Sequence, residues 1–122
     1  MTSSPRIAVV MDPIDEIKYA KDTTLAMLFA AQARGWSLLY LEQQDLSMRD
    51  GVALGRVRPL QVFKDPARWF ELGAPRVERL GDVDAILMRK DPPFDMEYIY
   101  TTYVLDRAEQ QGALVVNRPQ GL

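Results

Sequence analysis

Short apolar runs separated by helical patterns give this chain the order of an α/β protein. Residues 6–11 form a β-branched apolar run and predict a buried first strand, which ends at Asp12-Pro13 because proline restricts the residue before it to extended conformations. After a candidate N-cap at Asp22, apolar residues recur at helical spacing from Leu25. Residues 36–41 predict a second strand. Two strands joined by one helix in this way are expected to be parallel.

The middle of the chain departs from that rhythm. Asp50-Gly51 stands between two apolar segments and is a strong hairpin signal. Residues 55–63 continue with alternating polar and apolar positions, as do residues 76–80, which are typical of a solvent-facing strand. We therefore expect an antiparallel ribbon at one edge of the sheet.

The last third of the chain returns to the α/β order. Residues 84–88 predict a strand buried on both faces, and residues 113–116 predict another short buried strand. Between them Asp95 is a candidate N-cap for a second helix that ends near residues 107–111. We expect one face of this helix to carry Met96, Ile99, Tyr100, Tyr103, Val104 and Ala108. Its tyrosines are more typical of core and interface positions than of catalysis.

Composition limits the possible functions. With 122 residues, 48% of them hydrophobic, the chain can form one ordinary domain. Its net charge of −2 disfavours nucleic acid and membrane surfaces as partners. Cysteine and histidine are both absent, which excludes thiolate chemistry, a histidine base and the usual zinc sites. The short apolar run at the start is unlike a signal peptide or membrane span, so we expect a soluble cytoplasmic protein.

Charged residues follow the predicted parallel strands, at the edge where open α/β sheets bind ligands. Arg89 and Lys90 stand at the end of the strand formed by residues 84–88. Because a buried charge needs a partner, Arg89 should pair with Asp91, with Asp95 or with a ligand carboxylate. The sequence after the first strand lacks the glycine-rich fingerprint of dinucleotide-binding folds, so NAD and FAD are not expected there.

Simpler structural explanations exist for most of these residues. Asp12 can cap a turn, Asp22 can cap a helix, and Lys18 can be solvated. Arg89 is harder to explain as a solvated residue, because it stands at the end of an apolar strand. A charge-assisted hydrogen bond to a carboxylate, worth about 1.5–3 kcal/mol, would justify its position. The loop of residues 12–21 has little apolar material, so we expect it to be mobile.

Four segments carry a family resemblance: residues 10–14, 21–28, 86–95 and 116–119, which read V-M-D-P-I, K-D-T-T-L-A-M-L, I-L-M-R-K-D-P-P-F-D and V-N-R-P. Together they closely resemble the N-terminal domain of bacterial glutathione synthetase, the part that precedes the ATP-grasp module. The resemblance implies a Rossmann-like, pre-ATP-grasp, three-layer α/β domain with a mainly parallel central sheet and an antiparallel edge hairpin. It also implies that residues 1–122 form this one domain, with the ATP-grasp domain following residue 122.

The implied activity is ATP-dependent ligation of γ-glutamylcysteine and glycine through an acyl phosphate, in a homo-oligomer. ATP and Mg²⁺ would bind mainly outside this chain, which would be inactive alone and would contain no catalytic residue or metal ligand. Arg89 would hold a substrate carboxylate, and Asp12 a substrate ammonium group. The residues that the resemblance assigns to substrate binding are Met11, Asp12, Pro13, Lys18, Asp22, Thr23, Arg89, Lys90 and Asp91. The alternative is a non-catalytic α/β binding or oligomerisation module.

Overall fold

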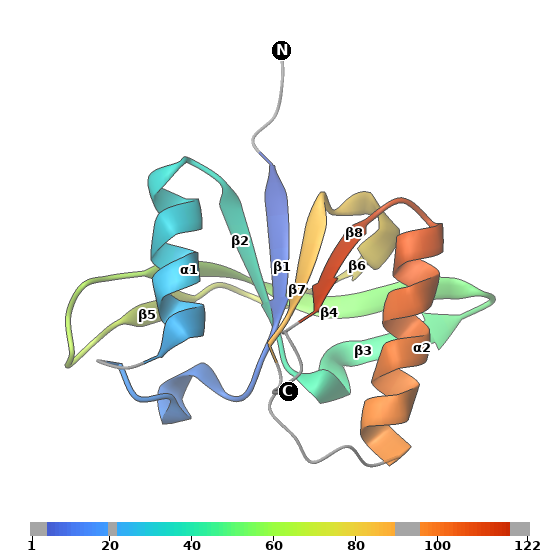
Figure 1. Cartoon of the computed structure of the whole chain (residues 1–122), viewed down its shortest axis with the longest axis horizontal. Helices are drawn as coiled ribbons and strands as arrows, with labels where there is room; N and C mark the ends of the chain where they lie inside the picture. Colours follow the sequence, from blue (N-terminus) through green and yellow to red (C-terminus); the bar gives the residue numbers. More distant parts are fainter. Residues whose placement is uncertain (1–4, 20–21, 90–95, 118–122) are drawn as a thin grey trace.

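Four parallel strands form the centre of the fold (Figure 1). The structure, a computed structural model, describes residues 5–19, 22–89 and 96–117. The central strands are β1 (Arg6–Val10), β2 (Ser37–Leu41), β7 (Ala85–Met88) and β8 (Leu114–Asn117). They lie in the order β2-β1-β7-β8, with Val9 paired to Tyr40 on one side and to Leu87 on the other. The predicted mainly parallel sheet is confirmed.

The described residues contain two α-helices, which cover opposite faces of this sheet. Helix α1 (Thr23–Ala33) connects β1 to β2, and helix α2 (Met96–Gln110) connects β7 to β8. The two connections run toward opposite edges of the sheet, and right-handed crossovers then place their helices on opposite faces. Asp22 caps α1 as predicted, because its carboxylate accepts from the Leu25 N–H at 2.8 Å. The Rossmann-like, three-layer arrangement is confirmed (Figure 1).

The predicted antiparallel ribbon is also present, built around one long strand. Asp50 and Gly51 both have positive φ, 51° and 76°, as a two-residue type I′ hairpin requires. The strands of this region are β3 (Leu46–Arg49), β4 (Val52–Val62), β5 (Phe70–Leu72) and β6 (Arg76–Arg79). Strand β4 pairs antiparallel with β2, β3, β5 and β6. It thereby joins the edge ribbon to the parallel centre.

The hydrophobic core consists of two clusters, one on each face of the central sheet. Alternate residues of β1 point to opposite faces: Ala8 and Val10 pack on the α2 side, Ile7 and Val9 on the α1 side. Strand β1 is therefore buried along almost its whole length, as its apolar run predicts. Within the described residues, no helix is both long enough and apolar enough to cross a membrane.

The predicted apolar face of α2 was wrong in part. Val104 and Ala108 are buried as expected, but they share the core face with Thr101 and Leu105. The remaining residues of the predicted face are exposed: Met96, Ile99, Tyr100 and Tyr103. Thr101 tolerates burial because its hydroxyl donates to the Glu97 carbonyl at 3.0 Å. The helix thus carries two apolar stripes, of which one faces the core and the other is exposed.

Candidate functional site

The candidate site lies where the chain leaves β1 and β7 in opposite directions. The Arg89 N–H donates to the Val10 carbonyl at 2.8 Å, and the Met11 N–H donates to the Leu41 carbonyl at 3.1 Å. These bonds hold the segments after β7 and β1 at the same edge of the sheet. In open α/β sheets such a divergence of the connections opens the crevice in which ligands bind. Asp12 and Arg89 therefore reach this edge from neighbouring strands, as predicted.

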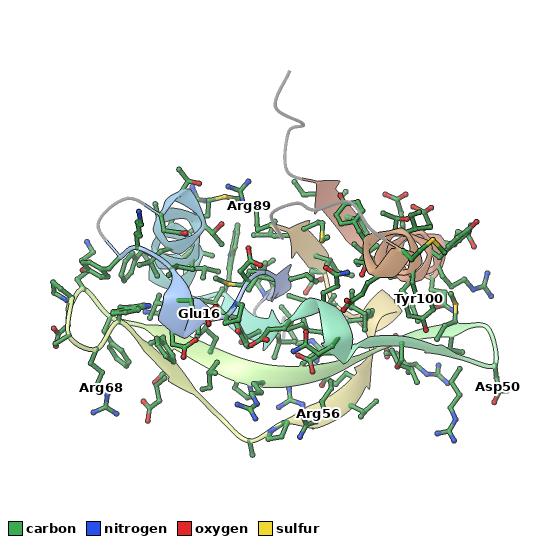
Figure 2. All side chains as sticks on the ribbon, turned by 90° about the horizontal axis from the view of Figure 1, so that it is seen from below. Glu16, Asp50, Arg56, Arg68, Arg89 and Tyr100 are labelled. Atoms are coloured by element: carbon green, nitrogen blue, oxygen red, sulfur yellow. The ribbon has the colours of Figure 1, made fainter. Side chains whose placement is uncertain are left out.

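The side chain of Arg89 extends from the end of β7 to the first turn of α1 (Figure 2). Its Nε donates to Thr24 Oγ1 at 3.1 Å, and its Nη2 donates to Thr23 Oγ1 at 3.0 Å. Thr24 is buried, whereas Thr23 is exposed. Among the described residues, the side-chain partners of Arg89 are thus two neutral hydroxyls. Of its predicted carboxylate partners, Asp91 and Asp95 lie outside the described residues.

This position makes the electrostatics of the site favourable for an anion. The N-terminus of an α-helix carries a partial positive charge and N–H groups without intrahelical partners. The guanidinium adds a full positive charge at the same place, and like charges so close repel each other. Asp22 offsets part of this charge from its capping position. A ligand carboxylate between Arg89 and the start of α1 would be stabilised by both positive groups.

The other predicted residues occupy several different environments. Met11 is buried at 2% exposure and packs in the core cluster on the α1 side. Asp12 and Pro13 are half-buried at the sheet edge, and Lys18 is exposed on the connecting loop. Lys90 and Asp91 lie outside the described residues. The structure thus brings Arg89 and Thr23 into direct contact and leaves Met11 in the core.

The loop after β1 is better anchored than its composition suggested. Ile14 begins a short 3-10 turn, η1 (Ile14–Glu16), and its side chain is 2% exposed. Ile17 and Tyr19 also pack against the core cluster on the α1 side. The premise that this loop has little apolar material to hold it was therefore wrong for residues 12–19, while the mobility of the loop stays a prediction.

Comparison with known proteins gives one consistent result. The sequence model of the family "Prokaryotic glutathione synthetase, N-terminal domain" matches residues 6–122. The chain belongs to this family. It is 64% identical to the glutathione synthetase of Pseudomonas putida and 63% identical to that of Pseudomonas aeruginosa, each over 98% of the chain and 38% of the relative. The glutathione synthetase of Vibrio vulnificus is 49% identical over 96% of the chain and 37% of the relative. The chain thus spans less than half the length of these relatives.

In this member of the glutathione synthetase family, three residues near the site were missed by the sequence analysis. Thr24 holds the Arg89 guanidinium, while Tyr40 and Trp69 bind the backbone of Ile14. A signal for Tyr40 was present, since a tyrosine within the buried run of residues 38–41 needs a partner for its hydroxyl. No comparable signal marked Trp69, which lies 55 positions from Ile14 along the chain.

Tyr40 gives the domain a predictable response to alkaline pH. Burial raises the pKa of its phenol well above the usual value of about 10, and the hydrogen bond to Glu42 adds to this shift, while the N–H of Ile14 opposes it. Above pH ~10 the phenol ionises in the unfolded chain but keeps its proton in the folded one. The contribution of Tyr40 to the free energy of unfolding is therefore fully present below this pH and is lost as the pH rises further.

The test compares urea unfolding of the wild type and Tyr40→Phe between pH 8 and pH 11. The difference in their free energies of unfolding is expected to be constant up to pH ~10. It should then shrink by about 1.4 kcal/mol per pH unit, the value for one proton. A constant difference over the whole range would contradict the assignment.

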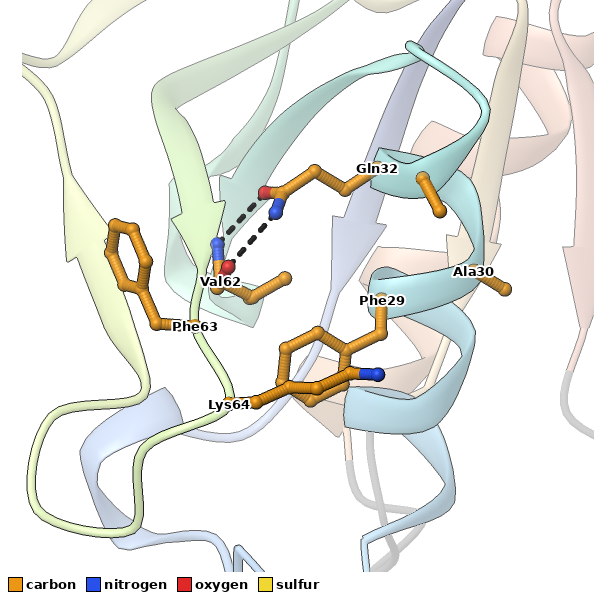
Figure 3. A pocket seen from close by; sticks show the side chains of 7 residues that line it. Phe29, Ala30, Gln32, Val62, Phe63 and Lys64 are labelled. Carbon is orange, nitrogen blue, oxygen red and sulfur yellow. Dashed lines mark hydrogen bonds between the residues drawn. The ribbon is translucent and has the colours of Figure 1, made fainter.

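A hollow of about 500 Å³ lies away from this edge, between the C-terminal half of α1 and the end of β4 (Figure 3). Its lining is mainly apolar, and the Gln32 amide is already bonded at both ends to the Val62 backbone, at 2.8 and 2.9 Å. The Lys64 ammonium lies 5.9 Å from the centre of the Phe29 ring. None of the predicted site residues lines this hollow.

Proposed function

We propose that this chain is the N-terminal, substrate-binding domain of a glutathione synthetase. In the full-length enzyme, γ-glutamylcysteine and glycine would be joined to glutathione by ATP-dependent ligation through an acyl phosphate. The proposal is supported by the family of the chain and by the names of its relatives. The observation that carries the role of this domain is Arg89, held by two threonine hydroxyls at the N-terminus of α1.

The chemistry of the dipeptide suits this edge of the sheet. γ-Glutamylcysteine has two carboxylates and one ammonium group. Arg89 and the start of α1 would bind a carboxylate, and Asp12 would attract the ammonium group. Lys18, Asp22, Thr23, Lys90 and Asp91 would complete the rim, with Pro13 as its wall and the buried Met11 as support beneath it. These residues would act by positioning, which can contribute several kcal/mol to catalysis without forming a bond.

ATP and Mg²⁺ would be bound elsewhere in the enzyme. Within the described residues, no group of three or more acidic side chains could hold a metal ion, and the sequence has no glycine-rich phosphate loop. The described residues therefore offer these cofactors no such site. Residues 1–122 would form one domain, and an ATP-grasp domain after residue 122 would supply both sites. This chain alone would be inactive.

We further propose that the full-length enzyme is a cytoplasmic homo-oligomer. The exposed stripe of α2, formed by Met96, Ile99, Tyr100 and Tyr103, is compatible with a contact between subunits. The same stripe is the observation that favours the alternative function, a non-catalytic oligomerisation module. That alternative has less support, because the relatives carry the name of an enzyme.

The test is a ligation assay on the full-length protein that contains this chain. Release of ADP is expected to require γ-glutamylcysteine and glycine together, with glutathione as the product detected by mass spectrometry. The isolated chain, assayed in parallel, should release no ADP. Absence of glutathione with the folded full-length protein would overturn the proposed function. ADP release that does not depend on the dipeptide would also overturn it.

A further inference from the structure

The backbone of Ile14 is held on both of its polar groups by side chains from distant parts of the chain. The Ile14 N–H donates to the Tyr40 hydroxyl at 3.1 Å, and the Ile14 carbonyl accepts from Trp69 Nε1 at 3.1 Å. Tyr40 comes from β2, and Trp69 directly precedes β5. We call this arrangement of Tyr40, Trp69 and the Ile14 backbone the Ile14 clamp.

The tyrosine arm of the clamp is itself fixed. Tyr40 is 4% exposed, and its hydroxyl donates to Glu42 Oε2 at 2.5 Å. Since the phenolic proton points to Glu42, the oxygen lone pairs remain to accept the Ile14 N–H. Glu42 is held in turn by Asp45, because each side chain accepts from the backbone N–H of the other. The acceptor for Ile14 therefore has one orientation.

The tryptophan arm contacts the loop at a second point. The centre of the Trp69 ring lies 6.0 Å from the centre of the Tyr19 ring and 5.7 Å from the centre of the Phe70 ring. The backbone of Trp69 is fixed because its carbonyl accepts from the Phe63 N–H at 2.8 Å. Trp69 thus contacts the loop near both of its described ends, at Ile14 through a hydrogen bond and at Tyr19 through ring contact.

The clamped positions flank the loop residues assigned to substrate. Asp12 and Pro13 directly precede Ile14, and Lys18 directly precedes Tyr19. On the other side, the Met11 N–H is bonded to the Leu41 carbonyl. The two residues between Met11 and Ile14 are therefore held from both sides, by β2 and by the clamp.

We infer that Tyr40 and Trp69 are positioning residues, which set the place of Asp12 and Lys18 for the dipeptide substrate. The inference rests on the proposed function for the identity of that substrate. Its physical basis is that side chains which bind a substrate must be placed accurately, because a displacement of about 1 Å can lower the reaction rate about 100-fold. Without the clamp the loop would keep its apolar anchor at Ile14 and lose the bonds that define its backbone.

The test uses the full-length protein with Tyr40→Phe and Trp69→Phe, each of which keeps a ring and removes one polar group. Two matched controls make similar changes outside the clamp. Gln111→Met also removes a side-chain oxygen that accepts a backbone N–H, from Ala53 at 3.0 Å. Trp36→Phe alters a tryptophan that packs against the same core cluster. For each protein, KM for γ-glutamylcysteine, KM for ATP and kcat are measured well below the unfolding temperature.

Each clamp variant is expected to raise KM for γ-glutamylcysteine about tenfold, and to change KM for ATP less than about twofold. The two controls should leave both constants within about twofold of the wild type. A purely structural role would lower the folded fraction, and hence the apparent kcat, without changing KM for one substrate selectively. Unchanged KM for the dipeptide in both clamp variants would overturn the inference.

Hydrogen exchange separates failure of the inference from failure of the proposed function. In Tyr40→Phe, exchange of the amides from Asp12 to Tyr19 is expected to accelerate about tenfold or more, with β1 and β7 unaffected. If the wild type makes no glutathione but exchange accelerates in this way, the proposed substrate is wrong and the clamp is supported. Unchanged exchange in this loop would overturn the clamp, whatever the substrate.

Discussion

Replacing Arg89 by alanine in the full-length enzyme is expected to reduce kcat/KM for γ-glutamylcysteine by about 10- to 150-fold. The reason is the loss of a charge-assisted hydrogen bond to a substrate carboxylate, worth about 1.5–3 kcal/mol. KM for ATP should stay close to the wild-type value, because ATP is proposed to bind in the part of the enzyme outside this domain. Steady-state kinetics with each substrate varied in turn measures both effects.

Two further variants test the reason for this effect. Arg89→Lys keeps the charge but loses the planar fork that contacts Thr23 and Thr24, so an intermediate loss is expected. Arg49→Ala removes an exposed arginine of β3, away from both the candidate site and the Ile14 clamp, and should leave the kinetics unchanged. If Arg89→Ala retained full kcat/KM, a substrate contact of Arg89 would be excluded.

Introducing aspartate at Val104 is expected to unfold the domain or nearly so. Val104 is completely buried on the core face of α2, so the new carboxylate would have no solvent and no partner. Removing one partner of a buried ion pair, which also leaves an unpaired buried charge, costs about 3–5 kcal/mol. The free energy of unfolding of a typical protein is only about 5–15 kcal/mol. Tyr103→Asp changes the neighbouring residue, which is 65% exposed, and should cost less than about 1 kcal/mol.

Urea unfolding followed by circular dichroism measures the difference between these two variants. If Val104→Asp yields no folded protein, Val104→Ala supplies a graded measurement, with an expected loss of at least about 1.5 kcal/mol. Equal stabilities for Val104→Ala and Tyr103→Asp would contradict the observed orientation of α2.

Features of the fold that depend on local sequence could be predicted. The β-branched run of residues 6–11 has few alternatives to a buried strand, and Asp50-Gly51 accommodates the positive φ angles of a type I′ turn. The orientation of α2 could be predicted only in part, because two apolar stripes compete on one helix. Which stripe faces inward depends on the surfaces of β4 and β8, which no pattern within the helix records.

In the candidate site, too, the features that depend on local sequence and strand order could be predicted. Arg89 and Asp12 were predicted at one edge because their positions follow from strand order. The contacts that hold them were not predictable in this way. Thr24 meets Arg89 across 65 positions of sequence, and Trp69 meets Ile14 across 55. Such contacts depend on the folded chain, and residues far apart in one sequence carry no sign of their pairing.

The order of the central sheet has a consequence during synthesis on the ribosome. Strand β1 is made first, but one of its two neighbours, β7, follows much later: Ile7 pairs with Ala85, 78 positions further along. At about 5–20 residues per second, β7 arrives roughly 4–16 s after β1. During this interval the apolar, largely buried strand β1 has an open edge on the side of β7, able to pair with other nascent chains. The early partners of β1, namely α1 and β2, protect only the other edge and one face.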